Sequence, residues 1–203
     1  SESLEKFKKE AEILRKIAEE HPCIVRLLDL IESPPALIFE LCSFSLRDLI
    51  NEKGGLGPTG ASEVLVQISD ALAFMHEKGY VHGDLKPENI LFSWDRIPKL
   101  ADFNTAKALA SVSRSRLGWT PGYAAPEQME GRITEITEKV DSWALGLVLY
   151  EASTGRPLLS PTSYREDVEK LRRGEIKYKS AGSRELDEII LSCIKIEPDE
   201  RMD

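Results

Sequence analysis

The sequence predicts an α+β fold, in which a helix and a small antiparallel sheet precede a larger, mainly helical part. Two observations predict this class. Strand-like runs are confined to the first half of the chain, and helical patterns dominate the second half. Strands and helices that are segregated in this way are typical of α+β proteins. The length of 203 residues and the hydrophobic fraction of 41% suffice to bury a substantial core.

The first elements are a helix and a pair of strands. Apolar residues recur at helical spacing along residues 3–20, so we expect an amphipathic helix there. Residues 24–31 and 36–41 are predicted as antiparallel strands on either side of Ser33-Pro34-Pro35.

Two helices and two short strands follow. A short helix is expected over residues 45–51, and a longer amphipathic helix over 61–78, with Gly79 at its C-terminal cap. Residues 90–92 and 99–101 are predicted as short strands around a turn.

The second half begins with a long loop and continues in helices. Residues 103–124 contain no periodicity and predict a functional or mobile loop. Residues 139–153 are apolar nearly all round, as expected of a central buried helix. Ser163 and Glu166 have the spacing of a capping box at the start of a helix that reaches about residue 173, and a last helix is expected over 184–195.

Composition narrows the choice of partners and location. The formal net charge of −8 argues against nucleic acid as a partner, because phosphate binding normally needs a basic surface. The three cysteines lie far apart without metal-ligand spacing, which indicates reduced thiols and a cytoplasmic location. No apolar run reaches the length of a membrane span, so no membrane segment is expected in this chain. The oligomeric state is not indicated.

A dense polar cluster lies in YVHGDLKPENILF, residues 80–92. Asp84 and Asn89 lie in a predicted loop, and Asp102 follows the second short strand, so three oxygen-bearing side chains are expected to converge. Magnesium prefers such ligands, with nucleotide phosphates completing its shell. Lys86 could neutralise charge on a transferring phosphoryl group. The alternative is that Asp84 and Lys86 form a surface pair and Asn89 caps a turn.

These residues carry a resemblance to a known family. Five motifs occur in the order found in eukaryotic-type protein kinases: HGDLKPEN at 82–89, DFN at 102–104, APE at 125–127, DSWALG at 141–146 and EPDER at 197–201. The resemblance covers nearly the whole chain. Lys86, two residues after Asp84, favours the serine/threonine branch.

The resemblance implies a phosphoryl-transfer site that uses ATP and Mg²⁺. Asp84 would orient the substrate hydroxyl and accept its proton, and Lys86 would contact the γ-phosphate. Asn89 and Asp102 would hold magnesium. Thr120 matches the threonine that bonds near the catalytic aspartate and lysine in this branch.

The adenine site is also implied by the resemblance. Leu91 would pack under the adenine ring. Glu40, Leu41 and Cys42 would form the hinge that offers backbone hydrogen bonds, and Phe39 would guard the pocket behind it.

Other residues match regulatory or structural positions of the family. Glu10 matches the acid that pairs with a phosphate-binding lysine, while Leu14, His82 and Phe103 match a hydrophobic spine. The alternative for Glu10 is a solvated helix face. Architectural roles fall to three further residues: Glu127, Asp141 and Arg201.

The resemblance divides the chain into residues 1–42, a partial small lobe with one regulatory helix and two strands, and residues 43–203, the large lobe. A glycine-rich loop and the strand with the phosphate-binding lysine are expected before Ser1, where this chain has no residues. We therefore interpret the chain as a fragment of a catalytic domain and expect little activity from it alone.

Two departures from the family pattern concern regulation. Gly83 replaces the usual arginine, which commonly binds a phosphorylated loop residue. We therefore expect activity without loop phosphorylation, and Ser111, Ser113 and Ser115 to form a polar loop. Asn104 replaces the glycine of D-F-G; asparagine tolerates positive φ, so the turn is expected to survive.

The leading hypothesis is a serine/threonine protein kinase that acts on a protein substrate. One alternative is a small-molecule kinase of the aminoglycoside or choline type, which often carries HGD. TPGYAAPE at residues 120–127 argues against it, because this element builds a peptide-substrate platform that those enzymes lack. The other alternative is a kinase-like scaffold without activity.

Overall fold

The computed structural model describes residues 2–102, 107–108, 119–132, 134 and 136–202, with the backbone alone at 2–4, 6–7, 9–10 and 107–108. Its elements in chain order are α1 (Glu2–Glu20), β1 (Leu27–Glu32), β2 (Pro35–Phe39), β3 (Phe44–Ser45), α2 (Leu46–Lys53), α3 (Gly57–Glu77), β4 (Tyr80–Val81), η1 (Pro87–Asn89), β5 (Ile90–Phe92), β6 (Pro98–Leu100), β7 (Lys107–Ala108), α4 (Pro126–Glu130), α5 (Lys139–Thr154), α6 (Tyr164–Arg172), α7 (Arg184–Cys193) and η4 (Pro198–Glu200). The predicted α+β class is confirmed.

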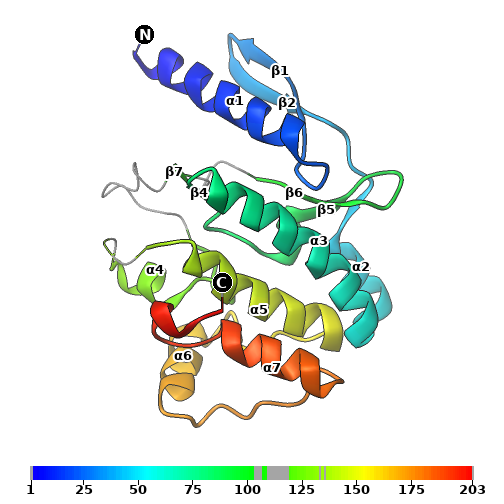
Figure 1. The fold of residues 1–203 in the computed structure, drawn as a ribbon, viewed down its shortest axis with the longest axis vertical. Coiled ribbons are helices and arrows are strands. Elements are labelled where there is room, and N and C mark those ends of the chain that lie inside the picture. Colours follow the sequence, from blue (N-terminus) through cyan, green and yellow to red (C-terminus); the bar gives the residue numbers. More distant parts are fainter. Residues whose placement is uncertain (1, 103–106, 109–118, 133, 135, 203) are drawn as a thin grey trace.

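Figure 1 shows α1 and the β1–β2 hairpin at one end of the molecule and the helical layers α3, α5 and α7 toward the other. The small sheet β3–β5–β6 lies between these ends, beside α3. No helix in the described ranges is both long and apolar enough to cross a membrane.

The first strand begins later than the sequence predicts. Residues 24 and 25 were expected to open the hairpin, but they pair with the end of β6. Val25 N–H donates to the carbonyl of Leu100 (2.9 Å), and Leu100 N–H donates to the carbonyl of Cys23 (2.8 Å). This short parallel contact ties the N-terminal segment to the sheet of the larger part.

A side-chain cap marks the start of α2, and a proline in the first turn marks the start of α3. Ser45 caps α2: its hydroxyl accepts from the N–H of Asp48, whose carboxylate accepts from the N–H of Ser45 (2.8 Å). Helix α3 begins at Gly57, earlier than expected, because Pro58 occupies its first turn, where a missing N–H costs no helical bond.

Helix α5 is the centre of the core, as predicted. The indole of Trp143 is fully buried, and Leu147 and Val148 are nearly so. Gly146 permits the close approach of α7, because a Cβ there would lie 2.6 Å from the Cβ of Cys193. The two helices therefore pack almost backbone to backbone.

Two local predictions differ from the structure, and a third lies mostly outside the described residues. Ser163 makes no side-chain cap at α6; its hydroxyl donates to Asp167 (3.0 Å), which also accepts from the N–H of Ser160 (3.0 Å). Helix α4 was not predicted, because its five residues are too few for a periodic pattern. The loop expected over 103–124 lies mostly outside the described residues, as do Ser111, Ser113, Ser115 and Asn104; its described part includes β7, paired with β4.

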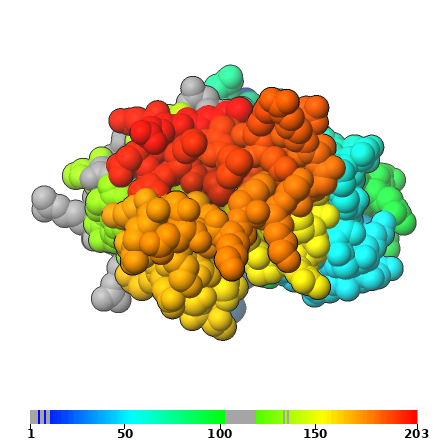
Figure 2. Space-filling model, turned by 90° about the horizontal axis from the view of Figure 1, so that it is seen from below, coloured from blue at the N-terminus to red at the C-terminus, as the bar shows by residue number. Residues whose placement is uncertain are grey.

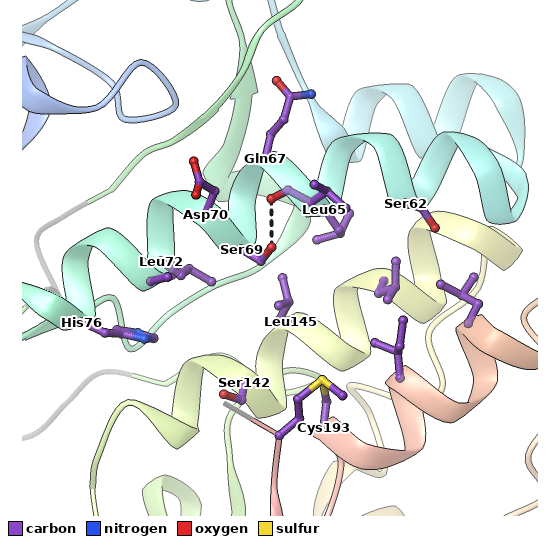
Figure 3. Close-up of a pocket in the computed structure, with 16 residues that line it drawn as sticks. Ser62, Leu65, Gln67, Ser69, Asp70, Leu72, His76, Ser142, Leu145 and Cys193 are labelled. Atoms are coloured by element: carbon purple, nitrogen blue, oxygen red, sulfur yellow. Dashed lines mark hydrogen bonds between the residues drawn. The ribbon is translucent and has the colours of Figure 1, made fainter.

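The helical part contains an apolar hollow of about 670 Å³. Figure 3 shows side chains of α3, such as Leu65 and Leu72, facing Leu145 of α5 and Cys193 of α7 across it. In Figure 2, the face seen from below is covered mostly by α6, α7 and the segments around them, with α2 at one edge.

Candidate active site

A buried carboxylate on α5 holds the start of the segment 82–89 in place. Asp141 accepts hydrogen bonds from the N–H groups of His82 and Gly83 and from Nε2 of His76, each at 2.8 Å. Burial opposes ionisation of Asp141, but the hydrogen bond from His76, the nearby histidines and the Gly83 N–H hold its pKa below the ordinary value. A charged, fully buried anchor therefore sets the path of the loop.

Hydrogen bonds at both ring nitrogens fix the orientation of the His82 imidazole. Nε2 lies 2.9 Å from the carbonyl of Ala101, which can only accept, so Nε2 carries the proton. Nδ1 then accepts from the N–H of Asp84 (3.3 Å). The imidazole thus connects the loop to the strand that precedes Asp102.

Asp84 is the centre of a three-residue polar cluster. Its Oδ2 accepts from Nζ of Lys86 (2.6 Å), and its Oδ1 accepts from the hydroxyl of Thr120 (2.6 Å). Lys86 also donates to Thr120 (3.0 Å). Only 10% of the Asp84 side chain is exposed, so the carboxylate is held in one orientation at the edge of solvent. The structure thus brings together three residues that lie up to 36 positions apart in the sequence.

Asn89 and Asp102 lie next to each other across the β5–β6 pair. The N–H of Ala101 donates to the carbonyl of Asn89 (2.9 Å), which places Asp102 one residue beyond. The Asn89 side chain donates its amide N–H to the carbonyl of Asp84 (2.9 Å), so its Oδ1 is the atom left to act as a ligand. Asp102 has a left-handed backbone with φ of 61°.

This donor set fits a magnesium ion that is bound together with a nucleotide. Among the described residues, no group of three or more His, Cys, Asp or Glu side chains could hold a metal alone. One amide and one carboxylate oxygen are too few for a closed site, and they match the few protein ligands that Mg²⁺ takes when phosphates complete its shell.

The predicted hinge lies at the junction of β2 and the larger part. Glu40 N–H donates to the carbonyl of Arg26 (2.9 Å), and Ser43 N–H donates to the carbonyl of Phe92 (2.7 Å). Between them lies Leu41, 77% exposed, and then Cys42, which is half-buried. Phe39 ends β2 at 36% exposure, and Leu91 lies half-buried in β5.

Lys99 is a hinge contact that the sequence did not predict. Its Nζ lies 2.8 Å from Oε1 of Glu40 and donates to the carbonyl of Pro22 (2.8 Å). Burial alone would raise the pKa of Glu40, but Lys99 and the N–H of Arg26 hold it below the ordinary value. No motif marks Lys99, because its partners come from distant segments.

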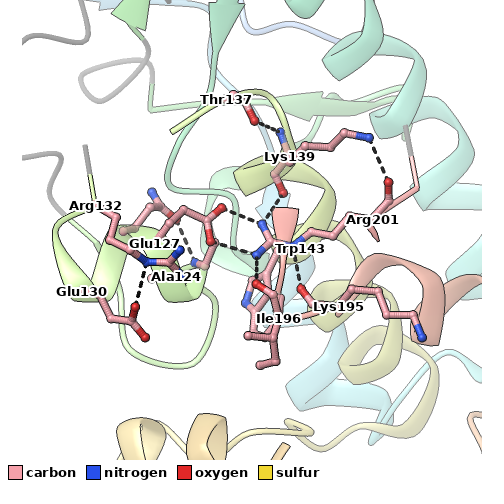
Figure 4. Close-up of polar contacts among 12 residues, drawn as sticks. Ala124, Glu127, Glu130, Arg132, Thr137, Lys139, Trp143, Lys195, Ile196 and Arg201 are labelled. Atoms are coloured by element: carbon pink, nitrogen blue, oxygen red, sulfur yellow. Dashed lines mark hydrogen bonds and ion pairs between the residues drawn. The ribbon is translucent and has the colours of Figure 1, made fainter. Parts of the chain in front are cut away.

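The segment TPGYAAPE, residues 120–127, is anchored at its last residue to the C-terminal segment. Figure 4 shows Arg201 opposite Glu127, with bonds from Nη1 to Oε1 (2.6 Å) and from Nη2 to Oε2 (2.8 Å). Gln128, also not predicted, donates to the carbonyl of Gly83 (2.8 Å) and so connects α4 to the loop that carries Asp84.

Part of the predicted regulatory set cannot be placed. Leu14 is half-buried against the core, and His82 is fully buried. Glu10 belongs to α1, but its side chain lies outside the described residues, and so does Phe103.

Comparison with protein families matches residues 1–203 to the family described as protein kinase domain. Serine/threonine-protein kinase PkaA of Streptomyces coelicolor is 35% identical over 205 residues, which cover 97% of this chain and 37% of that protein. Serine/threonine-protein kinase PknB of Mycolicibacterium smegmatis is 33% identical over 217 residues, covering 97% and 33%. Calcium/calmodulin-dependent protein kinase type IV of Homo sapiens is 38% identical over 137 residues, covering 64% and 28%. The chain spans about a third of the length of these relatives.

Proposed function

The chain belongs to the protein kinase family, and we propose that it catalyses transfer of the γ-phosphate of ATP to serine or threonine hydroxyls of protein substrates. The observation that carries this proposal is the cluster of Asp84, Lys86 and Thr120, in which a lysine and a hydroxyl fix an aspartate at the edge of solvent. The serine/threonine-protein kinases among its relatives support the same activity.

Asp84 acts on the protein substrate in this proposal. A substrate hydroxyl that approaches Asp84 is oriented for attack and transfers its proton to the carboxylate. Lys86 lies 2.6 Å from Asp84 and places a positive charge where the transferring phosphoryl group becomes more negative. Thr120 holds both side chains, so little rearrangement is needed in the transition state.

Asn89 and Asp102 are the residues proposed to hold Mg²⁺. When it is bound, the ion neutralises phosphate charge and orients the γ-phosphate. The chain contributes the amide oxygen of Asn89, set by the bond from its N–H to the carbonyl of Asp84. It also contributes the carboxylate of Asp102 at the end of β6.

The hinge at residues 40–42 is the proposed adenine site. The described residues offer Leu41 and Cys42 no hydrogen-bond partner, which leaves their backbone groups to an adenine ring. Leu91 of β5, which pairs with Ser45 shortly after the hinge, is proposed to supply the apolar surface for the ring. The division into a partial small lobe at 1–42 and a large lobe at 43–203 is part of the same proposal, with the nucleotide at the boundary.

We also propose a cytoplasmic location, where ATP is abundant. The three cysteines are free thiols, consistent with a reducing compartment. Fractionation of cells that produce the full-length protein tests this, and recovery outside the cytoplasm would contradict it.

The proposed activity is tested with the full-length protein, Mg²⁺ and γ-labelled ATP on a mixture of protein substrates. Label on serine and threonine that disappears in Asp84→Asn supports the proposal, with Asp95→Asn, an exposed turn residue, as the matched control. Label found only on small molecules, or protein labelling that survives Asp84→Asn, would overturn it.

A further inference from the structure

An ionic cluster that the sequence did not predict lies beside the candidate active site, centred on Arg47 of α2. The guanidinium donates from Nε to Oε1 of Glu88 (2.7 Å), from Nη1 to Oε1 of Glu151 (2.7 Å) and from Nη2 to the hydroxyl of Tyr123 (2.6 Å). Three segments far apart in the sequence therefore meet at one side chain.

The inner part of the cluster is largely shielded from solvent, Glu88 lies at its exposed edge, and one guanidinium faces two carboxylates. Only 24% of the Arg47 side chain and 4% of the Glu151 side chain are exposed. Burial opposes the charge on Arg47, but hydrogen bonds to Glu151 and Glu88 raise its pKa above the ordinary value. Burial and the charge of Glu151 raise the pKa of Tyr123, so its hydroxyl stays neutral and donates to Glu151 (2.5 Å).

Two partners of Arg47 belong to segments that carry the proposed catalytic groups. Glu88 is the middle residue of η1, the turn that ends in Asn89. Tyr123 belongs to the turn after Thr120, and its N–H donates to the Thr120 carbonyl (3.2 Å). The guanidinium thus contacts both sides of the cluster around the proposed catalytic aspartate.

The third partner fixes this arrangement to the core. Glu151 lies on α5, the same buried helix whose Asp141 holds the N–H groups of His82 and Gly83. Helix α5 therefore supports both ends of the loop at 82–89. Asp141 holds the start of the loop, and Glu151 holds its end through Arg47.

We propose that Arg47 is a positioning residue for phosphoryl transfer, which fixes Asp84 relative to Thr120 through Glu88 and Tyr123. The inference rests on the proposed kinase function. Phosphoryl transfer depends mostly on positioning, so a small displacement of either segment lowers the rate. The hydrogen bonds of Arg47 within the described residues include none to the hinge at 40–42, so turnover should fall more than nucleotide affinity.

The test compares Arg47→Met and Arg47→Lys in the full-length protein. Methionine keeps the apolar stem but removes all of these hydrogen bonds, and we expect kcat to fall about 10-fold or more, with KM for ATP changed by less than about twofold. Lysine restores the charge but not the planar fork, so we expect partial rescue. Arg184→Met is the matched control, because the Arg184–Glu188 pair is exposed and distant in sequence from these segments.

Unchanged kcat in a folded Arg47→Met protein would overturn the inference, and so would an equal loss of kcat and ATP affinity. If Arg47→Met does not fold, Tyr123→Phe removes one hydroxyl of the cluster and should lower kcat in the same way; unchanged kcat there also overturns it. If the wild type transfers no phosphate, the proposed function fails separately. Amide hydrogen exchange in residues 82–89 then tests the positioning role. Faster exchange in Arg47→Met than in the wild type supports this role, and equal exchange overturns it.

Discussion

Arg201 and Glu127 lie 74 positions apart and form a bidentate ion pair in which neither side chain is exposed to solvent. The guanidinium also donates to the carbonyls of Lys139, Lys195 and Ile196 and lies over the ring of Trp143. One side chain therefore connects α4, α5 and the C-terminal segment. Because the remaining donors of Arg201 are satisfied by carbonyls, the desolvation cost of this buried pair is well compensated.

Arg201→Met should destabilise the protein by about 3–5 kcal/mol, because it leaves the carboxylate of Glu127 buried without its partner. Denaturant unfolding of the full-length protein measures this. Arg184→Met, at an exposed pair, is the control and should cost less than about 1 kcal/mol. A loss at Arg201 no larger than that at Arg184 would contradict a structural role for the pair.

Asp84→Asn should lower kcat by about 10²–10⁴-fold with little change in stability. Asparagine keeps the shape of the side chain and can still accept from Thr120, but it cannot take a proton from a substrate hydroxyl. Steady-state kinetics and a thermal melt on the same preparation separate the two effects. A variant that retains full turnover would remove Asp84 from the proposed chemistry.

Asp102→Asn should weaken magnesium-dependent nucleotide binding by about 10-fold or more, because it removes the one carboxylate of the proposed metal site. Titration of Mg²⁺ at fixed ATP, followed by calorimetry, measures the change. Asp95→Asn is the matched control, since Asp95 is an exposed residue in the turn between β5 and β6. Identical Mg²⁺ titrations of the wild type and Asp102→Asn would place the metal elsewhere.

The lowered pKa of Asp141 predicts that the stability of the protein depends on pH. Its folded-state pKa lies below the ordinary value of 3.8, so it stabilises the protein fully above that value, and this contribution is lost as pH falls through the folded pKa. Asp141→Asn should therefore be clearly less stable than the wild type at pH 7, with a difference that narrows below about pH 4. Urea unfolding at several pH values checks this, and a constant difference across that range would count against an ionised Asp141.

The parts of the fold that the sequence predicts well are governed by local chemistry. The helix at 46–53 follows from Ser45 at its cap, and the central helix at 139–154 follows from its continuous apolar run. The start of α3 was missed because Gly57-Pro58-Thr59-Gly60 has the composition of a loop, although Pro58 suits a first helical turn.

The site residues also fall into two groups: those within one local motif, which the sequence predicts, and those joined only by long-range contacts, which it does not. Asp84, Lys86 and Asn89 lie within one short motif, so the sequence identifies them together. Arg47 and Lys99 were missed, because no local pattern connects them to their acidic partners. These lie 41 and 104 positions from Arg47 and 59 positions from Lys99. Long-range ion pairs of this kind depend on the packing of segments, which a single sequence does not reveal.

The contact between Lys99 and Glu40 should contribute to stability as a coupled pair. Both side chains are largely buried, at 9% and 14% exposure, and Lys99 also donates to the carbonyl of Pro22. Lys99→Met should therefore cost about 1–3 kcal/mol, since the carbonyl of Pro22 loses this donor and the carboxylate of Glu40 keeps only the Arg26 guanidinium (3.5 Å) as a cationic partner.

A double-mutant cycle isolates this pair. Glu40→Gln alone removes the carboxylate charge, and the double variant Lys99→Met with Glu40→Gln removes both partners together. We expect the double variant to lose less stability than the sum of the single variants, by about 1 kcal/mol, because the second change no longer breaks an ion pair. Strict additivity in denaturant unfolding would mean that the two residues do not stabilise each other. Coupling would show that Lys99 and Glu40 stabilise each other, so that this contact is one of those that hold the strand leading to Asp102 to the proposed hinge.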